Sequence, residues 1–110
     1  MGERDPFADP IDYEIIEEKA ATLGRVTARL EAALAALEAV EHEVAGGSSP
    51  PAEALARRAT LREEAAEWLW YVVVQREAMG VTHHDALFEV YRVPGVVRRF
   101  MGPRRKAPAG

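Results

Sequence analysis

A seven-residue rhythm of apolar side chains in the first half of the chain constrains its fold more than any other feature. The side chains that fall one heptad apart are Ile16, Leu23, Leu30, Leu37 and Val44. Those that lie three residues after members of this series are Val26, Ala33 and Val40. Such a seam, kept for about four heptads, is typical of helices that pack side by side as in a coiled coil. The sequence therefore predicts an all-α fold organised around one long helix.

This first helix is predicted to run from Pro10 to about Ala45. Asp9 can cap it, and Pro10 fits the first helical position, where its missing N–H leaves no hydrogen bond unmade. Gly46-Gly47 should end it. Gly24 lies in its interior and costs about 1 kcal/mol relative to alanine, a cost that we expect packing to override.

A short flexible turn, GGSSPP, separates this helix from a second one, predicted from Pro50 to Met79. Ser49 can cap its start, with Pro50 in the first turn. The linker is so short that the second helix must fold back on the first, which predicts an antiparallel hairpin. Gly80 should end the second helix, with Val81 placed for the hydrophobic contact of a Schellman cap.

Within the second helix, the stretch WLWYVVVQREAMG (68–80) is apolar on nearly every side. Trp68 and Trp70 are two residues apart, so on a helix they point about 200° apart. One helix face cannot bury both rings. A second packing surface is therefore needed, either from the C-terminal segments or from another copy of the chain.

Two short helices are predicted after this stretch. Thr82 lies three residues before Asp85, which is the spacing of a capping box with Asp in place of the usual Glu. The first short helix should therefore span about His83 to Tyr91. Pro94 should open the second, which is predicted to reach Met101 before Gly102-Pro103 stops the chain.

The length of the first helix favours a dimer. At about 1.5 Å per residue it would be about 54 Å long, whereas a compact 100-residue domain has a radius of gyration of about 13 Å. The rest of the chain cannot wrap such a rod evenly. The simplest completion is a homodimer in which two hairpins form a four-helix bundle.

Charge is divided unevenly along the chain: residues 1–89 carry 8 basic and 18 acidic side chains, and residues 90–110 carry 6 basic and none acidic. We expect residues 10–102 to form one helical domain, with a mobile lead-in (1–9) and a disordered basic tail (103–110). The basic side chains that could contact an anion or nucleic acid are Arg98, Arg99, Arg104, Arg105 and Lys106. A nucleic-acid-associated regulator is the alternative function; contact with the chain's own acidic body or a sister subunit is favoured.

The chain has no cysteine, which excludes disulfides, thiol nucleophiles and cysteine-ligated zinc, and which fits a reducing cytoplasm. Its longest apolar run, Trp68–Val74, is far short of the ~20 residues that span a bilayer. The acidic N-terminus lacks the pattern of a signal peptide. The sequence therefore predicts a soluble, cytoplasmic protein with no membrane contact.

Ionisable side chains occur without a recognised catalytic arrangement. His83 and His84 point about 100° apart on a helix, so they do not converge on one ion by themselves. The one variant left open joins His84 and Asp85 with Glu41 or His42. The chain has no Gly-rich phosphate loop, nucleophile motif or dinucleotide fingerprint. We therefore predict no catalytic, cofactor-binding or metal-binding residues, no cofactor, and no enzymatic activity.

Gln75-Arg76-Glu77 places polar side chains on the apolar stripe, since Gln75 continues the heptad position of Trp68. A polar side chain on such a seam often fixes register, and pairing with the acidic first helix is the favoured interpretation. The alternative is a pocket with Arg76 as an anion anchor. It would belong to a small-molecule site near Trp68, Tyr71, Gln75 and Tyr91.

A longer pattern covers the same region: Trp70-Tyr71-x-Val73-Val74-Gln75-Arg76-Glu77-Ala78-x-Gly80, then His84, Tyr91-x-Val93-Pro94, Arg99 and Met101-Gly102. It resembles a family of small bacterial all-helical proteins of unknown function. The resemblance covers about residues 10–102, implies a defined helical fold, and carries no activity. It directs attention to the Gln75-Arg76-Glu77 cluster and the Val93-Pro94 corner.

Together these features predict a non-enzymatic structural or protein-interaction protein that forms a homodimer and can bind a further protein partner. The side chains predicted to serve packing or interaction are Leu23, Leu30, Leu37, Trp68, Trp70, Tyr71, Gln75, Arg76, Glu77, Tyr91 and Pro94. A scaffold requires exposed apolar surface or a symmetric interface. A nucleic-acid binder requires Arg98, Arg99 and Arg104 on one face, and a ligand binder requires a concave apolar pocket with Arg76 or Gln75 pointing in.

Overall fold

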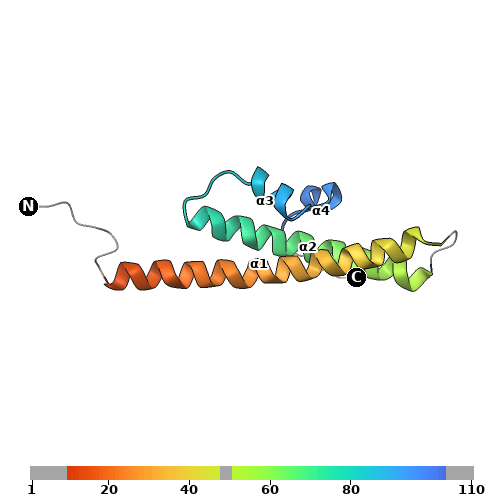
Figure 1. Ribbon diagram of the computed structural model, residues 1–110, viewed down its shortest axis with the longest axis horizontal. Helices are drawn as coiled ribbons and strands as arrows, with labels where there is room; N and C mark the ends of the chain where they lie inside the picture. The colour runs from red at the N-terminus through yellow and green to blue at the C-terminus, as the bar shows by residue number, and fades with distance from the viewer. Residues whose placement is uncertain (1–9, 48–50, 104–110) are drawn as a thin grey trace, which may run out of the picture.

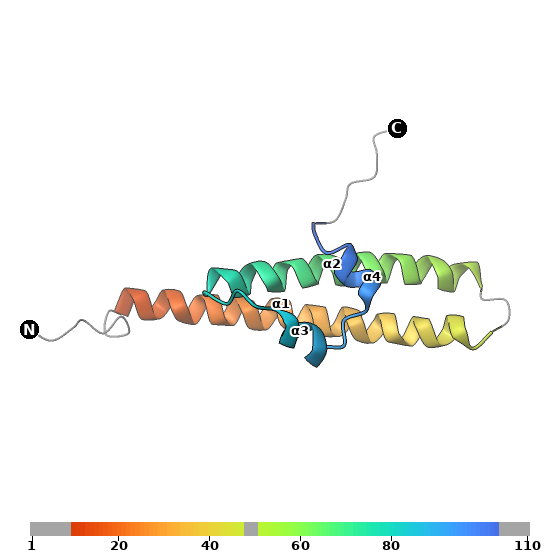
Figure 2. The same cartoon turned by 90° about the horizontal axis from the view of Figure 1, so that it is seen from above.

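The computed structural model describes residues 10–47 and 51–103, in which all the regular structure is helical. The elements are α1 (Pro10–Ala45), α2 (Ala52–Ala78), α3 (Asp85–Val90) and α4 (Gly95–Arg99). α1 and α2 pack side by side as a hairpin, and the chain after α2 turns back so that α3 and α4 lie along it (Figure 1, Figure 2). The predicted all-α hairpin with two short C-terminal helices is confirmed.

The core lies where the middle of α1 meets α2. On the predicted seam, Leu30 and Leu37 are 0% and 2% exposed. They cluster with buried side chains of α2, which are Ala54, Ala65, Ala66, Leu69, Val72 and Val73. Toward the ends of the seam, Leu23, Val26 and Val44 are half-buried. The middle of the predicted seam is therefore confirmed as the packed face of α1.

α2 has two packed sides, as its aromatic stretch requires. α1 covers one side, and α4 covers another, where Val97 is fully buried and the Gly102 N–H donates to the Ala66 carbonyl oxygen at 3.4 Å. Trp68 and Trp70 are both half-buried; helical spacing puts them at the two edges of the buried arc of α2. Of the two surfaces that the sequence allowed, the C-terminal segment supplies the second one.

α1 continues past the end of α2. The Gln75 side-chain amide donates to the Lys19 carbonyl oxygen, and Lys19 Nζ donates to the Ala78 carbonyl oxygen, each at 3.4 Å. These contacts place the last turn of α2 beside Lys19. We call residues 10–18, which project beyond this point, the α1 extension (Figure 2).

The α1 extension exposes large apolar side chains. Tyr13, Ile15 and Ile16 are 50%, 47% and 37% exposed. Ile16 was predicted as the first member of the packed seam, yet α2 ends before it can cover this turn.

No helix within residues 10–47 and 51–103 is both long enough and apolar enough to cross a membrane.

The C-terminal end of α2 has the hydrogen bonds of the predicted Schellman cap. The Val81 N–H donates to the Arg76 carbonyl oxygen and the Gly80 N–H to that of Glu77, both at 3.0 Å. Gly80 has a φ of +88°, in the region where glycine avoids the penalty of a Cβ atom. This cap turns the chain back toward the hairpin.

α3 ends in the same way without a glycine. The Val93 N–H donates to the Phe88 carbonyl oxygen at 3.0 Å, and the Arg92 N–H to that of Glu89 at 3.2 Å. Arg92 has a φ of +49°, which is uncommon outside glycine. The sequence predicted a break at Val93-Pro94; the reversal begins at Arg92, just before it.

The starts of α2 and α3 differ from the predictions. α2 begins at Ala52 with Pro51 at the N-cap position and no side-chain cap bond; the predicted cap Ser49 and first-turn Pro50 lie outside the described residues. α3 begins at Asp85 after His84, with no side-chain cap bond, so the predicted capping box of Thr82 is wrong. The His84 side chain bonds to Arg76 of α2 instead, and α3 begins at the next residue, Asp85.

Both short helices are also shorter than predicted, at 6 and 5 residues, because turns occupy their last positions. The predicted lead-in (1–9) with its cap Asp9, and all but the first residue of the predicted tail (103–110), lie outside the described residues.

Candidate functional site

A groove of about 480 Å³ lies between α1 and the turn that joins α3 to α4. We call it the α1 groove. The α1 side chains that line it are Glu31, Leu34, Ala35, Leu37, Glu38 and Glu41. The turn residues that line it are Val90, Tyr91, Arg92 and Pro94. One wall therefore combines carboxylates with apolar side chains, and the other is mostly apolar with one guanidinium group.

Tyr91 joins the two walls of the α1 groove. Its hydroxyl donates a hydrogen bond to the Glu31 carboxylate. Burial raises the pKa of Tyr91, and the hydrogen bond and negative charge of Glu31 raise it further, while the Arg76 guanidinium opposes this shift. Tyr91 therefore stays protonated well into the alkaline range and holds the turn against α1.

Arg76 holds the loop between α2 and α3. Its Nε–H donates to His84 Nδ1 at 3.2 Å, and its terminal nitrogen donates to the His83 carbonyl oxygen at 3.1 Å. Since a guanidinium can only donate, His84 Nδ1 must be an acceptor, and its ring proton lies on Nε2. Nε2 is 3.7 Å from a Glu77 carboxylate oxygen, with the His84 side chain only 13% exposed. Residues from α2 and the start of α3 thus form one polar cluster.

The predicted Gln75-Arg76-Glu77 cluster divides its contacts between two partners. Gln75 bonds to the α1 backbone at Lys19, which is an interhelix contact of the kind that fixes register. Arg76 and Glu77 instead contact His84. The structure therefore brings together Arg76, Glu77, His84 and Tyr91, all of which belong to the quoted pattern.

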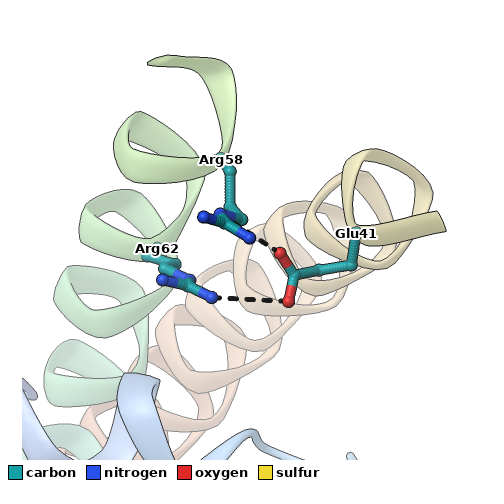
Figure 3. Close-up of polar contacts among 3 residues, drawn as sticks. All are labelled: Glu41, Arg58 and Arg62. Atoms are coloured by element: carbon teal, nitrogen blue, oxygen red, sulfur yellow. Dashed lines mark hydrogen bonds and ion pairs between the residues drawn. The ribbon is translucent and has the colours of Figure 1, made fainter. Parts of the chain in front are cut away.

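A second polar cluster joins the two long helices near their connecting turn. Arg58 Nε lies 3.5 Å from one Glu41 carboxylate oxygen, and an Arg62 terminal nitrogen lies 3.4 Å from the other (Figure 3). Arg57 pairs with Glu43, slightly closer to the connection between the helices. These pairs were not predicted. They could have been predicted from the hairpin, because in two antiparallel helices the residues that are equally far from the connecting turn lie opposite each other.

The predicted aromatic site does not gather around a described pocket. Tyr71 is 38% exposed and contacts both tryptophan rings, at centroid distances of 5.5 Å from Trp68 and 5.1 Å from Trp70. Of Trp68, Tyr71, Gln75 and Tyr91, only Tyr91 lines the α1 groove. The Arg29 guanidinium carbon lies 5.9 Å from the centre of the Trp68 ring, which adds a cation–π contact between α1 and α2.

The predicted basic residues fall into two groups. The Arg98 guanidinium carbon lies 4.3 Å from the centre of the Phe88 ring, so this side chain packs within the C-terminal segment. Arg99 is exposed. Arg104, Arg105 and Lys106 lie outside the described residues, so nucleic-acid binding stays a prediction. A salt-dependent shift of duplex DNA that is lost on deleting residues 103–110 would test it.

Within residues 10–47 and 51–103, no three histidine, aspartate or glutamate side chains gather as a metal site. His84 lies beside Arg76 and Glu77, and His42 lies 4.0 Å from Glu38 on the exposed face of α1. Searches of known protein families, curated proteins and solved structures found no match to this chain. The resemblance in the sequence therefore stays a prediction, and the geometry carries the functional proposal.

Proposed function

We propose that this protein is a non-enzymatic interaction protein that functions as a homodimer, with the α1 extension as part of its interface. One observation carries the proposal: the extension holds Tyr13, Ile15 and Ile16 at 50%, 47% and 37% exposure. Large apolar side chains gathered on one projecting segment are typical of a protein–protein contact.

The α1 extension gains little stabilisation from its own chain. Short helices are marginal in water, and most helical stability in proteins comes from packing an apolar face. Fully burying a large apolar side chain contributes about 1.5–3 kcal/mol. Tyr13 and Ile16 point only about 60° apart on the helix, so these two side chains favour a partner that covers them.

A second copy of the chain suits this role because the surface around α4 is complementary to the extension. Val90 and Phe100 are 73% and 64% exposed. The basic side chains of this region are Arg92, Arg98 and Arg99, whereas the acidic side chains of the extension are Asp12, Glu14, Glu17 and Glu18. Opposite charges orient association, and in a two-fold dimer each copy supplies both surfaces.

Sedimentation equilibrium at micromolar concentration tests the proposal. We expect a mass of about 24 kDa, twice the 12.1 kDa of one chain. A Tyr13→Asp/Ile16→Asp variant should sediment as one chain, and an Ala36→Asp variant, which adds a charge on a different exposed face of α1, should stay a dimer. A wild-type mass of one chain throughout the micromolar range would overturn the proposal.

A further inference from the structure

Within residues 10–47 and 51–103, nothing packs closely against Gly24. It lies inside α1, where glycine is the least favourable residue after proline. A Cβ atom added there would meet nothing within 4 Å, so no intrachain contact requires the absence of a side chain. Glycine on an exposed helix face permits the close approach of another backbone.

Gly24 lies midway between Tyr13 of the α1 extension and Ala35 of the α1 groove. The spacing is 11 residues in each direction, which is about 16 Å along a helix. Eleven residues make about three full turns, with a remainder of about 20°. Tyr13, Gly24 and Ala35 therefore share one face of α1, with the exposed tyrosine at one end and the groove at the other.

This equal spacing has a consequence for two-fold symmetry. If the α1 helices of two copies cross antiparallel at Gly24, the symmetry axis passes through Gly24, and Tyr13 of each copy meets Ala35 of the other. We propose that two copies associate in this way, with Tyr13 of each inserted into the α1 groove of the other. The inference rests on the proposed homodimer and specifies its interface.

The residues beside the crossing point are small. Ala20 and Ala28 lie four residues to either side of Gly24 and are exposed, and the same symmetry places Ala20 of one copy against Ala28 of the other. Small residues at a crossing let two helices approach closely. Farther out, Leu34, Val90 and Pro94 give the groove apolar walls for a tyrosine ring.

The charges that meet this occupant are of both signs, because Glu31, Glu38 and Glu41 line the α1 groove together with Arg92. Arg92 lines the α1 groove and forms no ion pair with another described residue. Asp12 and Glu14 flank Tyr13, so insertion of Tyr13 brings carboxylates toward this guanidinium. Glu17 of the second copy comes near Glu31, a like-charge contact that opposes association, so the dimer should depend strongly on Arg92.

Blocking the crossing point gives the first test, because it does not threaten the fold of one chain. Leucine is a better helix former than glycine, and space around Gly24 is open. Gly24→Leu should keep or raise the helical content while increasing the dimer dissociation constant about 10- to 100-fold. The control Ala36→Leu adds the same side chain to another exposed face of α1 and should leave the dissociation constant unchanged.

A cysteine at the symmetry axis gives the second test. The chain contains no cysteine, so Gly24→Cys creates a single thiol per chain. Two thiols related by the axis lie within disulfide reach when the Cα atoms are about 4.4–6.8 Å apart. Mild oxidation should link Gly24→Cys chains into covalent dimers, whereas Ala36→Cys chains should stay unlinked.

The outcomes separate this inference from the proposed function. A wild-type dimer that neither Gly24→Leu nor Arg92→Glu weakens, and in which Gly24→Cys does not cross-link, would overturn the Gly24 crossing and leave the homodimer standing. Arg57→Glu, near the connection between α1 and α2 and outside the proposed interface, is the charge control for Arg92→Glu and should have little effect. A wild-type chain that is monomeric overturns both.

Discussion

Two regions of α1 share one sequence pattern and differ in burial. Around Leu30 and Leu37 the heptad seam is almost inaccessible to solvent, at 0% and 2% exposed, whereas Ile16, on the same seam, is 37% exposed. The covered region faces α2 and the uncovered one lies beyond Lys19, where α2 ends. Periodicity thus shows which face of a helix is built to be packed, and the length of the neighbouring helix decides how much of it is packed within the chain.

Truncating the seam in each region gives the largest expected difference. Leu30→Ala removes a fully buried side chain and should lower the free energy of unfolding by about 2–5 kcal/mol. Ile16→Ala, measured below the concentration at which chains associate, should cost less than about 1 kcal/mol, since it removes an exposed group. Urea denaturation of both variants checks this. Equal losses would mean that the α1 extension is packed within its own chain.

Arg76 bonds to the loop that leads from α2 into α3, and we expect these bonds to hold the α3–α4 turn over α1. Arg76→Ala removes the bonds to His84 and to the His83 carbonyl oxygen and should lower stability by about 1–2 kcal/mol. Amide exchange should rise in residues 81–94 and stay unchanged at Leu37. Exchange that rises evenly along the chain would show that this loop does not open separately.

Tyr91 joins the same turn to α1 through Glu31. The Tyr91→Phe substitution should lower the free energy of unfolding by about 1 kcal/mol at pH 7. Its raised pKa means that the folded state holds the proton more tightly than the unfolded state does. The stabilisation is therefore complete below the unfolded pKa of about 10 and is lost as pH rises through the folded pKa.

The stability difference between wild type and Tyr91→Phe should accordingly shrink in strongly alkaline solution. Absorbance at 295 nm should show one of the three tyrosines ionising at a higher pH than the others, and Tyr91→Phe should remove that step. A constant stability difference across the alkaline range would contradict the hydrogen bond to Glu31.

The smallest effect is expected at Glu41, whose carboxylate forms ion pairs with Arg58 and Arg62 between α1 and α2. Its side chain is 44% exposed, and Arg62 is 33% exposed, so solvent screens the pair. Glu41→Gln should cost about 0.5 kcal/mol, and less at high salt. Glu38→Gln, on an exposed side chain, is the control and should change stability by less. An equal effect of both substitutions would deny the ion pairs a specific role.

The features that local sequence determines were predictable. The bounds of α1 follow from its proline, glycine pair and heptads, and the Gly80 cap follows from a glycine after the last apolar position. Contacts between distant segments were not predictable in this way. Nothing near Thr82 indicates that Arg76 will bond to His84, the residue just before α3.

The α1 groove has the same origin as that missed contact. The groove forms because the turn at Val90–Pro94 folds back over residues 31–41 of α1. Arg92 adopts a left-handed conformation in this turn, and because this position is not a glycine, the sequence does not predict that conformation. Residues such as Tyr91 and Pro94 were singled out by pattern. Their partners on α1, Glu31 among them, became evident only from the packing.

Both indole rings of the protein lie in one turn of α2, and both contact Tyr71. The tryptophan fluorescence of the protein therefore comes from one region of α2, which lies next to α1 and the C-terminal segment and apart from Tyr13 in the α1 extension. A tryptophan emission spectrum followed during unfolding would report the loss of the hairpin and would not detect fraying of the α1 extension. A dye or a new indole placed on the α1 extension would report its burial on self-association directly.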